Sequence, residues 1–204
     1  MRILIFSICL LFTETIFSQN WTGAADANWN NSANWSGWPL NGQDIVINPS
    51  FYSGNAVAPV ISANSTFSPA SVLIENGGSL TISANLTTQD DVEVTGPGSS
   101  LSVDNGTFNV NPSNGGRLII DLGGSMAING GITYVDERFI VGADAVVTIN
   151  NGTANSGERM VMDLGGKIIQ NGGTVSVAQT FAMNCVKKQI IFSLFLNKIH
   201  FWLQ

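Results

Sequence analysis

The chain has 204 residues, with 14 acidic against 8 basic side chains and a formal net charge of −6. This acidic balance argues against nucleic acids and anionic membrane surfaces as partners. Charged residues make up only 11% of the chain, whereas 22 glycines and many Asn, Ser and Thr residues favour short strands joined by tight turns. Residues 19–183 contain neither His nor Cys, which excludes Ser-His-Asp and Cys-His catalysis and metal sites built on those ligands from this part of the sequence.

Residues 1–18 have the pattern of a secretory signal peptide. Arg2 supplies the positive start, Ile3 to Phe12 form the apolar centre, and Ser18 precedes the expected cleavage before Gln19. The apolar run is too short to span a bilayer, so no membrane span is expected once the signal is removed. We therefore expect a secreted or cell-surface protein.

The next segment, residues 19–50, is rich in tryptophan. Its stretch "WTGAADANWNNSANWSGWP" holds four of the five tryptophans of the chain. One interpretation is a cap, because large aromatic side chains would cover the open end of a repeat fold. The other is a ligand-binding platform in which Trp29, Trp35 and Trp38 stack against sugar rings. The position directly before the repeats favours the cap.

The same segment carries a spaced set of aromatic and turn residues, which "DIVINPS" follows: Trp21-x-Gly23, Trp29, Asn34-Trp35, Gly37 and Pro39. This spacing resembles the amino-terminal module of large secreted bacterial β-helix and autotransporter-like passenger proteins. The resemblance covers about residues 20–50. It implies a parallel β-helix that begins directly afterwards, and it implies no known chemistry.

Residues 51–183 contain repeats. The segment 117–141, "RLIIDLGGSMAINGGITYVDERFIV", aligns without a gap with 159–183, "RMVMDLGGKIIQNGGTVSVAQTFAM", at an offset of 42. A half-period of 21 recurs in "RLIID", "RFIVG", "RMVMD" and "TFAMN", and a second short apolar segment follows a Gly-bearing turn in each unit. Such a unit cannot bury its own apolar face, but stacked copies can, with each strand pairing in parallel one turn below. We therefore predict an all-β parallel β-helix (β-solenoid), with Asn-Gly at its corners and stacked, hydrogen-bonded asparagines.

Three arginines, Arg117, Arg138 and Arg159, fall at one repeat position and are predicted to form a column with a spacing of about 5 Å. Such a column would bind an anionic polysaccharide or supply the base of a lyase-type elimination. The alternative is a solvated surface position at which Glu137 and Glu158 offset the charge, and this is the commoner case.

Two acidic residues, Asp121 and Asp163, are also equivalent and are predicted to lie two turns, or roughly 10 Å, apart. That separation is near the carboxylate spacing of inverting glycosidases. Both residues open a "DLGG" turn, where the carboxylate would instead accept hydrogen bonds from turn amides. The stretch "QDD" (89–91) with Glu93 offers oxygen ligands for calcium, but this signal is weak, because the sequence lacks the calcium-binding repeat G-G-x-G-x-D. We therefore predict no cofactor and no metal.

The last segment, residues 184–204, departs from the repeats and contains no Gly, no Thr and no acidic residue. We interpret it as the product of a frameshift or premature stop, which makes the chain an amino-terminal fragment of a larger protein that is truncated at its C-terminus. A capping segment over the last turn is the alternative.

These patterns together predict a non-catalytic extracellular or cell-surface solenoid that acts as a structural or adhesive stalk. Its expected partner is an extracellular polysaccharide or a cell surface. Two alternatives stay open. One is a pectate-lyase-like polysaccharide lyase or hydrolase that uses the arginine column, and the other is a glycan-binding module.

Overall fold

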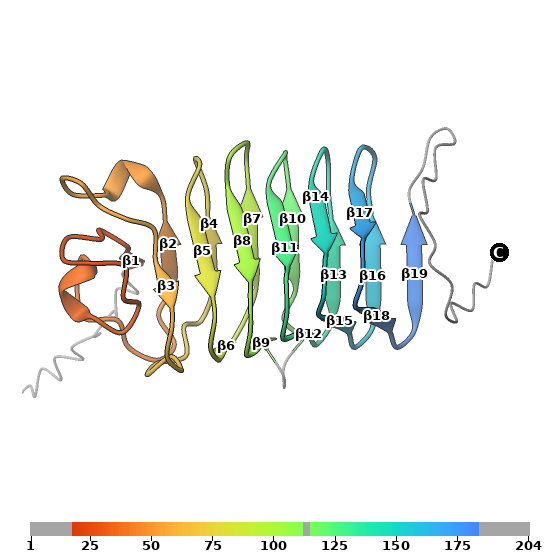
Figure 1. Ribbon diagram of the computed structural model, residues 1–204, viewed down its shortest axis with the longest axis horizontal. Helices are drawn as coiled ribbons and strands as arrows, with labels where there is room; N and C mark the ends of the chain where they lie inside the picture. Colours follow the sequence, from red (N-terminus) through yellow and green to blue (C-terminus); the bar gives the residue numbers. More distant parts are fainter. Residues whose placement is uncertain (1–17, 112–114, 184–204) are drawn as a thin grey trace, which may run out of the picture.

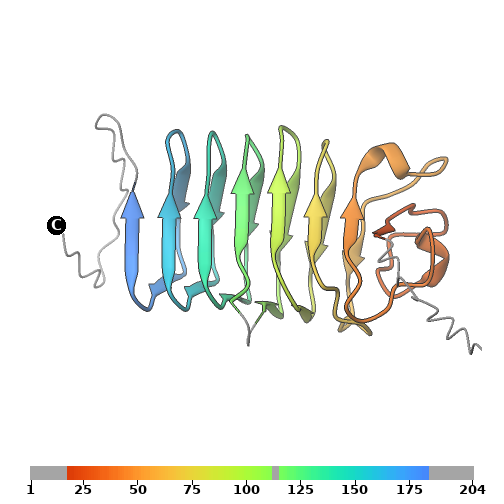
Figure 2. The ribbon, with the colours of Figure 1, turned by 180° about the vertical axis from the view of Figure 1, so that it is seen from behind.

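The computed structural model describes residues 18–111 and 115–183, which form a parallel β-solenoid of about six turns. Three parallel sheets run along its length and enclose one hydrophobic core. Figure 1 shows the turns side by side along the long axis, with the tryptophan-rich segment at one end and β19 at the other; Figure 2 shows the same arrangement from behind. The predicted fold class is confirmed.

The chain visits the three sheets in turn, and two short 3-10 helices, η1 (Ser32–Asn34) and η2 (Pro49–Phe51), interrupt the first part. Sheet 1 has eight strands: β1 (Gln19–Asn20), β2 (Ile45–Ile47), β4 (Val72–Ile74), β7 (Val92–Thr95), β10 (Leu118–Asp121), β13 (Arg138–Val141), β16 (Arg159–Met162) and β19 (Thr180–Met183). Sheet 2 has six: β3 (Val60–Ile61), β5 (Ser79–Ile82), β8 (Ser100–Val103), β11 (Ser125–Ile128), β14 (Val146–Ile149) and β17 (Lys167–Gln170). Sheet 3 has five: β6 (Leu86–Thr88), β9 (Thr107–Val110), β12 (Ile132–Val135), β15 (Thr153–Ser156) and β18 (Thr174–Val177).

The repeat period sets the register between turns. Leu118 pairs with Phe139, and Met160 pairs with Phe181, so that residues 21 apart are neighbours on adjacent turns. The sequence predicts two strands per repeat, and this is wrong, because the structure has three. The strands of sheet 3 directly follow the Asn-Gly corner, and two of them, LTT in β6 and TANS in β15, lack the apolar alternation of a strand, whereas TFNV in β9 shows it.

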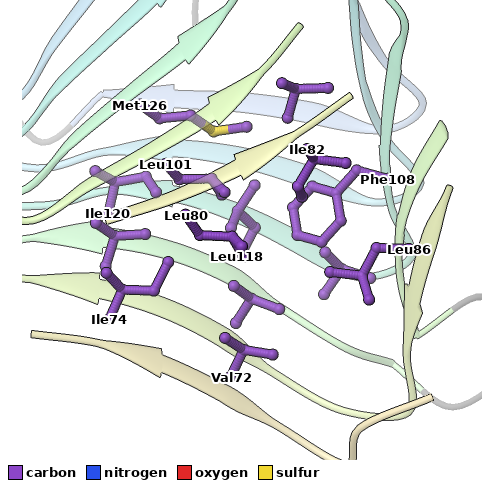
Figure 3. Close-up of a cluster of buried hydrophobic side chains, with 14 of the residues drawn as sticks. Val72, Ile74, Leu80, Ile82, Leu86, Leu101, Phe108, Leu118, Ile120 and Met126 are labelled. Atoms are coloured by element: carbon purple, nitrogen blue, oxygen red, sulfur yellow. The ribbon is translucent and has the colours of Figure 1, made fainter. Parts of the chain in front are cut away.

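Alternation along each strand fills the core. In β8, Leu101 and Val103 point inward and are buried, whereas Ser100 and Ser102 lie on the outer face. Full burial of one aliphatic side chain contributes about 1.5–3 kcal/mol, so stacked turns supply the stability that a single turn lacks. Figure 3 shows inward side chains from different strands meeting in this core: Val72, Ile74, Leu80, Ile82, Leu86, Leu101, Phe108, Leu118, Ile120 and Met126.

The corner between sheets 2 and 3 carries the predicted asparagine ladder. Asn171 Nδ2 donates to Asn150 Oδ1 at 2.8 Å, and Asn150 Nδ2 donates to Asn129 Oδ1 at 2.7 Å. The ladder ends on Asp104, whose Oδ1 accepts from Asn129 Nδ2 at 2.9 Å. The left-handed corner conformation is also present, with a φ of +68° at Gly131.

The two ends of the described solenoid differ in how well their apolar side chains are covered. At the amino-terminal end, Trp21 and Trp29 are fully buried, and Trp35 packs edge-to-face against both. At the other end, the inward side chains of Ile168 and Phe181 remain partly exposed, because no further described turn covers them. Residues 1–17 of the expected signal peptide and the atypical segment 184–204 lie outside the described residues.

Candidate functional site

Trp38 differs from the other tryptophans of the described segment. Its side chain is 67% exposed, whereas Trp21 and Trp29 are 0% and Trp35 is 6% exposed. Burying a tryptophan removes about 150–250 Å² of surface from water and stabilises the fold, and most of this stabilisation is absent at Trp38. Of the three residues considered for a sugar platform, Trp29 and Trp35 have their ring faces packed inside the protein, and only Trp38 presents its ring.

The indole N–H groups show the same contrast. Trp21 Nε1 donates to the carbonyl of Val57 at 2.9 Å, and Trp29 Nε1 donates to Ser65 Oγ at 2.9 Å. Trp35 Nε1 donates to the carbonyl of Trp29 at 3.0 Å. The indole N–H of Trp38 has no such acceptor among the residues that the structure describes. It therefore remains available to a ligand.

Trp38 stands at a shallow hollow of about 220 Å³ in the tryptophan-rich end. The lining consists of apolar side chains, amides and hydroxyls, without a charged residue: Asn30, Ser32, Trp38, Pro39, Leu40, Asn41, Thr66 and Phe67. Pockets for drug-sized ligands measure about 300–1,000 Å³, so this hollow suits one small ring rather than a large molecule.

Backbone contacts hold the hollow in shape. Asn41 Oδ1 accepts a hydrogen bond from the backbone N–H of Ser68 at 2.6 Å. Asn30 Oδ1 accepts from both the N–H and the hydroxyl of Thr66, at 3.0 and 3.1 Å. Phe67, which also lines the hollow, stacks on Trp29 with ring centroids 5.3 Å apart. The hollow is therefore connected to the buried aromatic cluster.

This arrangement matches neutral, polyhydroxylated ligands. An exposed indole ring offers a flat apolar face with a polar edge, while amides and hydroxyls both donate and accept hydrogen bonds. An ionic ligand would find no opposite charge in the lining. The sequence identifies Trp38 as a candidate, but it does not identify Asn30 or Thr66, which lie 36 residues apart and meet only in the fold.

The three predicted arginines lie at the start of successive strands of sheet 1, and Arg138 pairs in register with Arg159. Two of them are engaged in ion pairs. Arg117 binds Asp91 through its Nε and Nη2 atoms, and Arg138 contacts Glu137 at 2.8 Å. Arg159 is exposed and makes no ion pair with a residue of the described part of the chain.

The three arginines belong to a longer column of equivalent positions, which we call the strand-start ladder. It runs along one margin of sheet 1 through Asp44, Ser71, Asp91, Arg117, Arg138 and Arg159. Ser71 Oγ donates to Asp44 Oδ1 at 2.7 Å. Acidic and hydroxyl side chains thus occupy the first three turns of the ladder, and arginines occupy the next three.

Asp121 is the last residue of β10 and Asp163 directly follows β16, so the two acids lie on turns that are separated by one intervening turn. The Asp121 carboxylate accepts hydrogen bonds from the backbone N–H groups of Leu122 and Ala143, both at 2.7 Å. Gly142 occupies the equivalent position between the two acids, and a Cβ there would lie 2.2 Å from Asp121 Oδ1. Asp121 therefore has a structural task in the turn.

The acidic side chains of Asp90, Asp91 and Glu93 do not form one cluster. Asp91 binds Arg117, whereas Glu93 lies on the outer face of β7, where burial raises its pKa and the neighbouring Asp121, Asp91 and Glu75 raise it further. Among the described residues, no group of three or more His, Cys, Asp or Glu side chains is placed to hold a metal ion.

Comparisons with protein-family models, with curated proteins and with solved structures give no match. The parallel β-solenoid defines the class of this protein. A search of residues 18–111 and 115–183 for membrane-spanning helices finds none of sufficient length and hydropathy.

Proposed function

We propose that the protein is a non-catalytic extracellular β-solenoid, a structural or adhesive stalk, that contacts neutral carbohydrate through Trp38. The exposed Trp38 ring at its uncharged polar hollow carries this proposal. The signal-like pattern of residues 1–18 supports export, and export would bring the hollow to a cell surface or an extracellular polysaccharide.

The side chains considered for catalysis support the non-catalytic part of the proposal. Arg117 and Arg138 are held by carboxylates, and the Asp121 carboxylate bonds two turn amides. A general base needs a free lone pair at the reacting proton, and an arginine fixed by a carboxylate is kept in its charged form.

A retention assay on insoluble polysaccharides tests the binding function with the full chain. Wild type should be retained on at least one neutral polysaccharide, and Trp38→Ala should reduce the affinity at least tenfold. Trp38→Phe should keep part of the binding, because a ring face remains. Phe51→Ala is the matched control, since Phe51 is also aromatic and exposed, at 43%, but lies outside the hollow.

Two results would contradict the proposal. Equal retention of wild type and Trp38→Ala would remove the role of the hollow. Release of reducing ends or unsaturated sugars from the same polysaccharides, lost in Arg159→Ala, would favour the lyase or hydrolase alternative.

A further inference from the structure

The outer face of sheet 1 differs from the outer faces of the other two sheets. The central outward column of sheet 1 is apolar except for two residues, Asn20 and Glu93; its members are Asn20, Val46, Leu73, Glu93, Ile119, Ile140, Val161 and Ala182. The corresponding columns of sheets 2 and 3 consist mostly of hydroxyl and amide side chains, such as Ser100, Ser125, Asn109 and Asn155. A half-buried apolar stripe thus runs along one side of the solenoid, and continuous apolar surface of this kind is typical of a contact surface.

The strand-start ladder runs beside this stripe, and its charges are segregated along the long axis. Asp44 and Asp91 lie toward the tryptophan-rich end, whereas Arg117, Arg138 and Arg159 lie toward β19. Because the ladder is acidic at one end and basic at the other, two copies placed antiparallel would bring opposite charges together. A two-fold axis across the face, between β7 and β10, would place Asp44 opposite Arg159 of another copy, while Asp91 and Arg117, which pair within each chain, would lie at the centre of the contact.

We propose that two copies of this chain associate face to face through sheet 1, with their long axes antiparallel. The same two-fold axis sets Val46 against Val161 and Leu73 against Ile140, so that the apolar stripe covers itself. A parallel pair would instead set the arginines against the other margin of the sheet. There Arg117 would face Asp121 and Arg159 would face Asp163, but in the central column Glu93 would face Glu93 of the other copy. The antiparallel arrangement avoids this pair of like charges, because it sets Glu93 against Ile119.

The size of the face predicts a weak dimer. Eight strands at a spacing of about 4.8 Å, with four residues at about 3.3 Å each, give a face on the order of 500 Å² per copy. This lies at the lower end of specific protein interfaces. Association should therefore depend on protein concentration in the micromolar range and above.

A charge exchange distinguishes this dimer from other assemblies. Within one chain, Asp44 and Arg159 are separated by five strand spacings of sheet 1, or roughly 24 Å, so they cannot form an ion pair with each other. Sedimentation velocity of the full chain over a range of concentrations should show a monomer–dimer equilibrium. Asp44→Arg and Arg159→Asp should each weaken the dimer at least fivefold, and the double variant should restore it to within about twofold.

Matched variants separate loss of the face from loss of the fold. Ile140→Asp, in the centre of the stripe, should abolish the dimer, whereas Thr148→Asp on the outer face of sheet 2 should leave it unchanged. Unchanged far-ultraviolet circular dichroism should accompany each variant. A wild-type chain that stays monomeric at all concentrations, or a double variant no better than the two single variants, would overturn the proposal.

Discussion

The guanidinium of Arg117 binds both carboxylate oxygens of Asp91 on the preceding turn, with Nε 3.2 Å from Oδ1 and 3.0 Å from Oδ2. The backbone N–H of Arg117 also donates to Asp91 Oδ1, at 2.8 Å. This bidentate pair joins two turns at the point where the strand-start ladder changes sign.

Replacing Arg117 should therefore destabilise the solenoid more than replacing Arg159, which occupies the equivalent position two turns further along. We expect Arg117→Ala to lower the free energy of unfolding by about 1 kcal/mol, because a bidentate pair exceeds an ordinary surface pair in strength. Arg159→Ala removes no described ion pair and should stay within about 0.5 kcal/mol of wild type. Urea unfolding of both variants checks this, and equal losses would show that the ion pair contributes nothing.

The two environments of tryptophan predict opposite sensitivities. Trp29→Ala should cost about 3–5 kcal/mol, because it empties a buried site between Trp35 and Phe67. Trp38→Ala should change the free energy of unfolding by less than about 0.5 kcal/mol, since its ring is 67% exposed. Thermal and urea unfolding provide the measurement. A large loss of stability in Trp38→Ala would mean that the ring serves the fold rather than a ligand.

The asparagine ladder offers a test with adjacent residues of the same type. Asn150 both donates to Asn129 and accepts from Asn171, so Asn150→Ala should cost about 1 kcal/mol. The side chain of Asn151 is exposed and takes no part in this ladder, and Asn151→Ala should be close to neutral. If urea unfolding gave the same midpoint for both variants, the hydrogen bonds of the ladder would contribute nothing to the free energy of unfolding.

Glu93 should make stability depend on pH. Its pKa in the folded protein is raised above the ordinary value of 4.5, first by burial and then by Asp121, Asp91 and Glu75. The folded state therefore binds its proton more tightly than the unfolded state, and stability is lost as the pH rises from below 4.5 through the raised pKa.

Glu93→Gln removes this dependence. The variant should match wild type at the acidic end and exceed it at neutral pH, by less than about 1 kcal/mol after solvent screening. Urea unfolding of both proteins at a series of pH values gives the difference curve. A difference that stays flat, or that favours wild type at neutral pH, would contradict the argument.

Two glycines with positive φ separate the effect of backbone conformation from that of space. At Gly77, with φ +83°, a Cβ would meet no atom within 4 Å, so Gly77→Ala should cost about 1 kcal/mol from conformation alone. At Gly131, with φ +68°, a Cβ would lie 2.4 Å from the carbonyl oxygen of Gly106 on the adjacent turn. Gly131→Ala should therefore cost at least about 2 kcal/mol. The melting temperatures of the two variants check this prediction. A lower melting temperature for Gly77→Ala than for Gly131→Ala would contradict it.

Periodic features of the fold were accessible from the sequence, and solitary ones were not. A period of 21 predicts which residues become neighbours, because parallel stacking places equivalent residues on adjacent turns; Arg138 beside Arg159 and the ladder from Asn129 to Asn171 follow from it. The third strand escapes this reasoning, since stretches such as "TANS" in β15 lack apolar alternation and resemble a loop.

The hollow beside Trp38 could be predicted only in part. The four tryptophans lie in one short segment with similar small and polar neighbours, so the local sequence does not show which ring faces water. Exposure depends on whether a distant residue covers the ring: Phe67 stacks on Trp29, and Ser65 accepts its indole hydrogen bond. Such contacts arise from the packing of the first turns, and the segment has no second copy in the chain whose spacing would reveal them.

The asparagine ladder and the in-register strands also bear on how such a chain changes over generations. Within residues 18–111 and 115–183, strands and ladder asparagines pair with the turn before and the turn after, so the energetic consequences of adding or removing a unit are confined to one junction. A duplication or deletion of one whole repeat in the gene would rejoin asparagine to asparagine and strand to strand. Molecular length is thus a heritable variable that unequal recombination can tune, while the specialised tryptophan-rich end stays the same.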